Sequence, residues 1–358
     1  MSVPGAQPDR GAVQATLDYH GRISQAMTVE RTALASALIP VTPYIIVSAI
    51  EAYRRYPEMV RTIAAAMDPA EIGRAGRRPG NQIDPVHLWS IANIPLVGRQ
   101  VFAPLSLLDL AIIGRGCTAG DALVASVRIA QRAEEVGVRR VWYAEHHNMG
   151  SIASSSPAVI IAHVAAHTTT ITLGAGGVML PNHSPLTIAE QYGTLATLHP
   201  GRIELGLGRA PGSDQVTMRA MRRDHTSADT FADDVREVQG YLGDHSLVAG
   251  VSAVPGAGTH VPLYILGSSL YGAGLAAHLG LPYAFASHFA PDALRDAVAL
   301  YRSRFQPSAV LGAPRVLAAV NVICDDTDDD AAVQFRTAAR WRVQRFLQLP
   351  ETLDDAEL

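Results

Sequence analysis

Arg140-Val-Trp-Tyr-Ala-Glu-His-His-Asn148 is the stretch that decides the fold. Its first half is an apolar and aromatic run without helical spacing, which predicts a short buried strand at residues 140–144. Its second half presents a carboxylate, two imidazoles and an amide. Such a change is typical of the point where a barrel strand ends and a catalytic loop begins. We therefore expect Glu145, His146 and His147 at the carboxyl end of a parallel strand.

Short apolar runs alternate with helix-length segments from residue 105 onward. The predicted strands are residues 105–113, 140–144, 171–179, 202–208, 261–266, 283–286 and 316–323. The predicted helices are residues 118–136, 157–167, 185–198, 227–242, 269–279, 290–305 and 329–347. Strict alternation implies a parallel sheet, and the number of units favours a (β/α)8 TIM barrel over an open sheet. The dinucleotide fingerprint is missing, because Gly206, Gly208 and Gly212 are spaced differently.

The segment before this alternation is different in character. We predict that residues 1–102 form an N-terminal, mainly helical extension and that residues 103–358 form the barrel domain. Tyr44-Ile-Ile-Val-Ser48 is either a short strand or the start of a helix. Residues 74–85 are rich in Gly, Pro and Arg, as linkers are.

Composition excludes several classes of function. The net charge of −4 does not favour nucleic acid or an anionic membrane as a partner. All 29 basic residues are Arg, so Schiff-base chemistry and the lysine-containing phosphate loop are excluded. Cys117 and Cys324 are too few for a disulfide framework or a cysteine zinc site, and we predict both as small core residues. No signal peptide or convincing membrane span is visible, so we expect a cytoplasmic protein.

Glu145-His146-His147-Asn148 has two interpretations. The residues could form a proton-transfer cluster, since histidine titrates near neutral pH and a carboxylate can fix its tautomer. They could also be a polar loop whose histidines are simply hydrogen-bonded. A metal site is not expected, because neither a zinc-binding helix motif nor a cysteine partner is present.

Three further loops follow predicted strands. Asn182 and His183 lie in a Pro-rich turn, for which capping of the next helix by Asn182 or Ser184 is the favoured interpretation. Arg209 follows a strand among glycines, and a guanidinium is well suited to phosphate. Ser268 and Ser269 precede a helix, where they would either cap it or frame a phosphate site. Arg209 and this serine pair lie on consecutive loops, so both could reach one phosphate.

Six stretches of the chain keep the order and spacing of a known family. They are Ala144-Glu-His-His-Asn148, Gly176-Gly-Val-Met-Leu-Pro-Asn-His183, Ala189-Glu-Gln191, His199-Pro-Gly-Arg-Ile-Glu-Leu-Gly-Leu-Gly-Arg-Ala-Pro-Gly212, Leu266-Gly-Ser-Ser269 and Tyr283-Ala-Phe-Ala-Ser-His288. Residues from about 103 to 345 thereby resemble the bacterial-luciferase-like family of flavin-dependent monooxygenases. The resemblance implies a (β/α)8 barrel that uses reduced FMN and O2 to oxidise a small organic substrate. It also implies a separate flavin reductase and leaves a homodimer open.

The resemblance assigns roles to individual residues. His146 matches the family's active-site histidine beside the flavin, with Glu145 and His147 in support. The cofactor-binding positions that it implies are Gly176 and Gly177, where the family often has a non-proline cis peptide, and Arg209, Ser268, Ser269 and Gly272 at the phosphate. Asn182 and His183 would line the substrate side.

Two departures leave alternatives open. Gly208 stands where luciferases carry a reactive cysteine, so light emission is not implied. The family continues beyond the point where this chain stops, so an eighth strand is expected to be absent unless residues 42–50 take its place. The functional alternatives are an F420-dependent hydride-transfer enzyme and a non-catalytic, degenerate flavin-binding protein.

Overall fold

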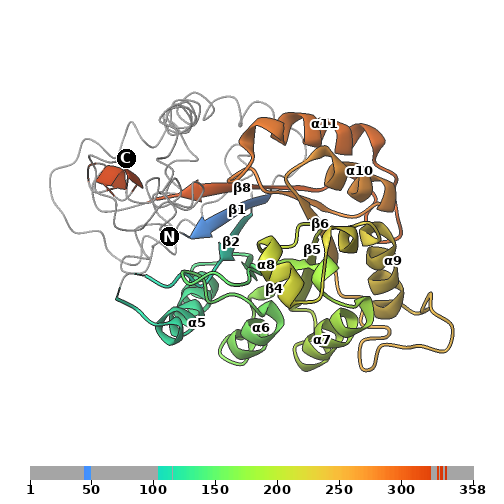
Figure 1. The fold of residues 1–358 in the computed structure, drawn as a ribbon, viewed down its shortest axis with the longest axis horizontal. Helices are drawn as coiled ribbons and strands as arrows, with labels where there is room; N and C mark the ends of the chain where they lie inside the picture. Colours follow the sequence, from blue (N-terminus) through green and yellow to red (C-terminus); the bar gives the residue numbers. More distant parts are fainter. Residues whose placement is uncertain are drawn as a thin grey trace, which may run out of the picture. The chain divides into compact units, whose positions relative to one another are not determined.

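The computed structural model describes residues 44–49, 104–114, 116–323, 329, 331–333 and 335–336, with the backbone alone described at residues 44–49. Eight strands follow one another in the chain. They are β1 (Tyr44–Ala49), β2 (Leu105–Asp109), β3 (Arg140–Tyr143), β4 (Thr172–Met179), β5 (Ile203–Gly208), β6 (Leu263–Gly267), β7 (Tyr283–Phe285) and β8 (Val316–Val322). All neighbours are parallel, and the order β1 to β8 closes into a barrel (Figure 1). The predicted fold class is confirmed.

β1 closes the barrel. It pairs with β2 through Ile45 and Leu105, and with β8 through Tyr44 and Leu317. The expectation of an absent eighth strand is therefore wrong, and the alternative that residues 42–50 take its place is confirmed, because Tyr44–Ala49 pairs with both the first and the last strand of the predicted barrel. β1 lies in the segment predicted to be a helical extension, and the rest of that segment, with its boundary near residue 102, lies outside the described residues.

Helices cover the outside of the strands (Figure 1). The α-helices are α5 (Ala119–Glu135), α6 (Pro157–Ala165), α7 (Pro185–Leu198), α8 (Gln215–Ala220), α9 (Phe231–Leu242), α10 (Leu270–Leu279) and α11 (Leu294–Arg304). The single-turn 3-10 helices are η1 (Leu180–Asn182), η2 (His225–Ala228) and η3 (Pro291–Ala293). α8 and η2 were not predicted, because both are too short to show helical periodicity. The helix predicted at residues 329–347 lies mostly outside the described residues.

A buried ion pair lies among the core aromatic side chains. Arg140 Nε lies 3.3 Å from Glu204 Oε2, and Trp142 Nε1 donates to the same oxygen at 3.1 Å. The hydroxyl of Tyr264 donates to Glu204 Oε1 at 2.9 Å. Trp142 and Tyr264 belong to one buried cluster with Leu108 and other small and aliphatic residues. Because side chains fill the interior of such a barrel, ligands bind at its ends.

Local capping orients the helices against the strands. Thr118 and Asp121 form the capping box at the start of α5, as the sequence predicts. Near the end of the same helix, Glu134 accepts hydrogen bonds from the backbone amides of Thr169, Thr170 and Ile171 just before β4. Cys117 is exposed, so its prediction as a core residue is wrong, since it lies in the loop before the Thr118 cap.

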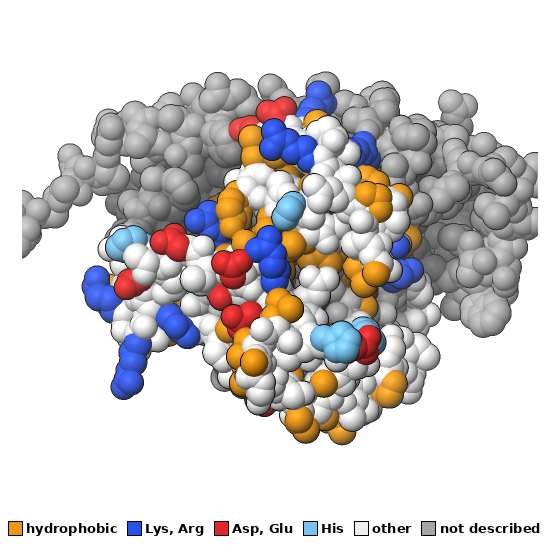
Figure 2. Space-filling model, turned by 90° about the vertical axis from the view of Figure 1, so that its right-hand side faces the viewer, with side chains coloured by type: hydrophobic (Ala, Val, Ile, Leu, Met, Phe, Trp, Pro, Cys, Tyr) orange, Lys and Arg blue, Asp and Glu red, His pale blue; other side chains and the backbone are white. Residues whose placement is uncertain are grey.

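The described surface is mixed in charge. Figure 2 shows arginine, acidic and hydrophobic side chains lying next to one another on one face of the molecule. Among the described residues, no helix is both long and apolar enough to cross a bilayer.

Candidate active site

Glu145 is the centre of a polar cluster at the carboxyl end of β3. The burial of that strand continues through Ala144 into Glu145, whose side chain is only 1% exposed. An ionised carboxylate at such a position requires hydrogen-bond donors. Four donors meet it, and they come from its own loop and from the end of β4 with the following turn.

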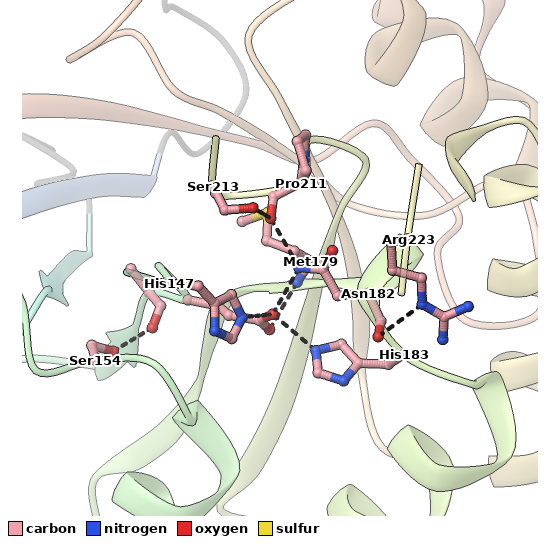
Figure 3. A network of polar contacts seen from close by, with 10 residues as sticks. His147, Ser154, Met179, Asn182, His183, Pro211, Ser213 and Arg223 are labelled. Carbon is pink, nitrogen blue, oxygen red and sulfur yellow. Dashed lines mark hydrogen bonds and ion pairs between the residues drawn. The ribbon is translucent and has the colours of Figure 1, made fainter. Parts of the chain in front are cut away.

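Two imidazoles share one oxygen of this carboxylate. Nε2 of His147 lies 2.9 Å and Nε2 of His183 lies 2.8 Å from Glu145 Oε1 (Figure 3). Asn182 Nδ2 donates to the same oxygen at 3.3 Å, and the amide of Met179 donates to Oε2 at 3.0 Å. The structure thus brings together Glu145 and His147 with both residues assigned to the substrate side.

The cluster keeps Glu145 ionised. Burial by itself raises the pKa of this carboxyl, but the hydrogen bond and positive charge of His183, with the bonds from His147 and the Met179 amide, lower the pKa overall. A carboxylate only accepts hydrogen bonds, so both imidazoles donate through Nε2. In a neutral imidazole Nδ1 is then the acceptor, so both rings can take up a proton at that atom.

Tyr192 lies behind the cluster and stays neutral. Its side chain is fully buried, and burial together with the charge of Glu145 raises the pKa of the phenol well above its usual value. This tyrosine therefore contributes no charge at the site.

The loop after β5 fixes the cluster from a third direction. The carbonyl of Pro211 accepts from Asn182 Nδ2 at 2.9 Å, and that of Gly212 accepts from the His147 amide at 3.2 Å. Gly212 has φ +63°, and a Cβ there would lie 2.9 Å from the Glu145 carbonyl oxygen. Only glycine combines this left-handed conformation with so close an approach.

His146 is half-buried beside the cluster. Its amide donates to the Ser154 carbonyl at 2.9 Å, and the Ser154 hydroxyl donates to the Ala144 carbonyl (Figure 3). Ser154 is fully buried, so it ties the β3–α6 loop back onto the end of its own strand. His146 thereby has a fixed backbone position.

Gly176 and Gly177 form a non-proline cis peptide in β4, as the resemblance implies. A Cβ on Gly176 would lie 2.8 Å from Leu108 Cδ1, and one on Gly177 would lie 2.7 Å from the Gly206 carbonyl oxygen. Larger residues would therefore displace the neighbouring strands.

A second group of expected residues lies at the start of α10. Arg209 is exposed directly after β5, and its guanidinium carbon lies 4.3 Å from the ring centroid of Tyr271 in the first turn of α10. Arg209 Nε donates to the Ala228 carbonyl at 3.4 Å. Ser269 is the N-cap of α10 but makes no side-chain capping bond. The interpretation that the Ser269 side chain caps the helix is therefore wrong, and its hydroxyl makes no bond to the first turn of α10.

The other members of this group complete the turn. Ser268 precedes the N-cap, and Gly272 is buried, where an added Cβ would lie 3.3 Å from Tyr283 Cε2. β3 to β6 are parallel neighbours, so both groups lie at the same end of the barrel.

Three residues that contact the candidate site were not predicted from the sequence. Ser154 and Tyr271 gave no signal, because a serine in a polar loop and a tyrosine in a helix are ordinary. Arg223 donates from Nε to the Asn182 carbonyl at 3.3 Å, across 41 positions of the chain. Its only signal is its place in the Arg222-Arg223 pair. At Ser184, by contrast, the capping interpretation is confirmed, because its hydroxyl accepts from the Thr187 amide.

Comparison with known proteins decides the family. The family model described as luciferase-like monooxygenase matches residues 108–357, well over half of the chain. The chain belongs to the luciferase-like monooxygenase family. As a luciferase-like monooxygenase it is an oxidoreductase of the oxygen-incorporating class, and the resemblance found in the sequence is confirmed.

Several relatives of this luciferase-like monooxygenase are informative. A protein of Escherichia coli strain K12 named luciferase-like monooxygenase is 56% identical over 232 residues, which cover 64% of this chain and 69% of the relative. An N-acetyl-S-alkylcysteine monooxygenase of Bacillus subtilis strain 168 is 39% identical over 187 residues, 51% of this chain and 56% of the relative. The crystal structure of apo-MsnO8 has a TM-score of 0.64 at 35% identity, covering 68% of this chain and 73% of that one.

Proposed function

We propose that this protein is a flavin-dependent monooxygenase that uses reduced FMN and O2 to oxidise a small organic substrate. The observation that carries the proposal is the approach of Arg209 to Tyr271, 4.3 Å from guanidinium to ring, beside an N-cap serine that makes no capping bond. First-turn amides of a helix and an adjacent guanidinium are the groups that bind phosphate well.

The residues around this point fit a phosphorylated flavin. Arg209, Ser268 and Ser269 would hold the phosphate, and Gly272 lets the start of α10 pack closely. Gly176 and Gly177 would support the ring system, since neither can carry a side chain without displacing its neighbours. Reduced flavin, when bound, supplies the electrons that activate O2.

The protein's own side chains handle protons and position the substrate. We assign proton transfer near the flavin to His146, which the loop locked by Ser154 holds at the strand end. Glu145 orients His147 and His183 through Nε2, so Nδ1 of each is the atom that exchanges a proton. Asn182 and His183 would line the substrate side.

The surroundings of the reaction belong to the same proposal. A separate reductase would supply the reduced flavin, because the sequence carries no nicotinamide-dinucleotide fingerprint. We place the reaction in the cytoplasm and leave a homodimer as the assembly to test. The Bacillus subtilis relative is named for an S-alkylcysteine derivative, so thioethers are the first substrates to assay.

Binding titrations test the cofactor. The full chain should bind FMN at least about tenfold more tightly than riboflavin, which lacks the phosphate. Arg209→Gln should remove this difference while riboflavin binding is unchanged. F420 is titrated in parallel, and tight binding of F420 alone would favour hydride transfer. Absence of binding to any of the three would support the non-catalytic alternative.

Incorporation of labelled oxygen into the product tests the reaction. With reduced FMN, a thioether and ¹⁸O2, the protein should transfer one labelled oxygen atom into the product. Product without label would contradict a monooxygenase. His146→Ala should lower turnover more than FMN affinity, and Arg209→Gln should do the reverse.

A further inference from the structure

Arg223 lies beside the Glu145 cluster and is not used by the function proposed above. It is half-buried in the segment between α8 and η2, and its Nε donates to the Asn182 carbonyl at 3.3 Å (Figure 3). Asn182 in turn donates through Nδ2 to Glu145 Oε1 at 3.3 Å. One residue thus separates the Arg223 guanidinium from the buried carboxylate.

The backbone holds Arg223 in this place. The amide of Arg223 donates to the Met218 carbonyl of α8 at 2.9 Å. The preceding residue, Arg222, has φ +59°, a left-handed conformation that residues other than glycine rarely adopt. Such outliers persist where the surroundings enforce them, and they concentrate at functional sites. The guanidinium is therefore positioned before any ligand arrives.

The two terminal nitrogens of Arg223 are open to a ligand. Within the described part of the chain, neither Nη1 nor Nη2 has a hydrogen-bond or ion-pair partner. Two acidic side chains lie nearby: Asp234 accepts from the Thr230 hydroxyl at 2.9 Å and interacts electrostatically with Arg223 without forming an ion pair, and Asp224 accepts from the Thr226 amide at 2.9 Å. A guanidinium fixed at Nε with both other nitrogens available presents the planar fork that binds a carboxylate.

The groups around Arg223 favour an anionic substrate. Glu145 is buried and its oxygens accept from four donors, so this carboxylate is not available to pair with a cationic substrate. Asn182 and His183 donate hydrogen bonds to Glu145 at this edge of the cluster. Arg223 adds a positive charge beside them. A cationic substrate would be repelled by Arg223, whereas an anionic substrate would pair with it.

We propose that Arg223 determines substrate specificity by binding a carboxylate of the substrate, so that the preferred substrates are small organic acids. This inference rests on the proposed function for its location, because it takes Asn182 and His183 as the substrate side. The two arginines would then have different roles. Arg209, beside α10, would bind the cofactor phosphate, and Arg223, beside Asn182, would bind the substrate.

A matched pair of probes tests the proposal. N-acetyl-S-methylcysteine carries a carboxylate, and its methyl ester is the same thioether without the charge. Calorimetric titration of the full chain, with and without FMN, should show that the acid binds at least about tenfold more tightly than the ester. Arg223→Gln should abolish this preference, and Arg223→Lys should restore only part of it. Arg219→Gln removes a charge from exposed α8 and should leave the preference intact.

The outcomes are distinguishable. If wild type binds acid and ester equally, or binds neither, or if Arg223→Gln keeps the preference, the proposal is wrong. If Arg223→Gln instead weakens FMN about tenfold and leaves riboflavin unchanged, Arg223 is a phosphate ligand and not a substrate residue. A protein that fails to bind FMN but retains the acid preference would contradict the proposed cofactor and leave the role of Arg223 standing.

Discussion

His183 Nε2 lies 2.8 Å from Oε1 of Glu145, although 38 positions of the chain separate the two residues. β3 and β4 are adjacent and parallel, so the loops that follow them meet at one end of the barrel. The same oxygen also binds His147, which fixes the donor atom of both imidazoles. This carboxylate is the link between the fold and the proposed chemistry.

Replacing Glu145 with Gln should damage both stability and turnover. The amide would place a donor against the Met179 amide or the imidazoles, so we expect the free energy of unfolding to fall by about 2 kcal/mol at pH 7. Chemical denaturation measures the change, and Glu190→Gln on α7 is the control. Turnover should fall further than FMN affinity.

The effect of Glu145→Gln should depend on pH. The pKa of Glu145 in the folded protein lies below its usual value of 4.5, so the carboxylate stabilises the fold fully above that value. The stabilisation is lost as the pH falls through the folded-state pKa. The difference between variant and wild type should therefore shrink in acid, and a difference that grows there would contradict an ionised Glu145.

Glu134 should be a second acid-sensitive point, away from the site. Partial burial raises its pKa, but hydrogen bonds from the backbone amides of Thr170, Ile171 and Thr169 and from the Thr170 hydroxyl lower the pKa to about 2. Glu134→Gln should cost about 1 kcal/mol at pH 7, with solvent limiting the effect, and much less at pH 2. Glu135→Gln removes only the surface pair with Arg132 and should be nearly neutral.

Gly212→Ala should disturb the site more than an equivalent change elsewhere. Gly212 and Gly250 both have positive φ, at +63° and +76°, so both alanine variants carry a similar backbone cost. Only at Gly212 would the new Cβ meet the Glu145 carbonyl, at 2.9 Å. Turnover should fall for Gly212→Ala and stay at the wild-type level for Gly250→Ala. Equal loss would mean that the β5 loop does not shape the Glu145 cluster.

Tyr271 should support Arg209 through its ring. Tyr271→Ala removes the aromatic face under the guanidinium, and we expect FMN affinity to fall about threefold. Tyr271→Phe keeps the face and should bind FMN like wild type. Fluorescence titration measures both, and a loss in the phenylalanine variant would assign the effect to the hydroxyl instead.

The barrel could be predicted because each strand is a compact apolar run followed by a polar or glycine-rich turn. Arg140 to Glu145 shows this most clearly, since the change from aromatic to ionisable residues marks the strand end. β1 was left open between strand and helix, because a six-residue, mainly apolar run outside the regular alternation does not show which strands it pairs with. Only the pairing with β2 and β8 settles it.

The site was predictable where its residues lie in the loops that follow strands. Arg209 follows β5 directly, and Glu145 and His183 lie in the loops after β3 and β4, so the structure places all three at the carboxyl end of the barrel. Arg223 was not predictable in this way, because it reaches Asn182 from a segment beyond α8 with no periodic pattern. The sharing of Glu145 Oε1 by two imidazoles could not be predicted either, because it depends on how the loops after β3 and β4 are positioned relative to one another.

The most direct test of the central claim is the crystal structure of this protein with FMN. The account predicts the phosphate within hydrogen-bond distance of the Arg209 guanidinium and of the first-turn amides of α10, with the flavin ring at the Gly176–Gly177 peptide. A phosphate bound elsewhere, or a flavin that leaves Arg209 and α10 without contact, would contradict it.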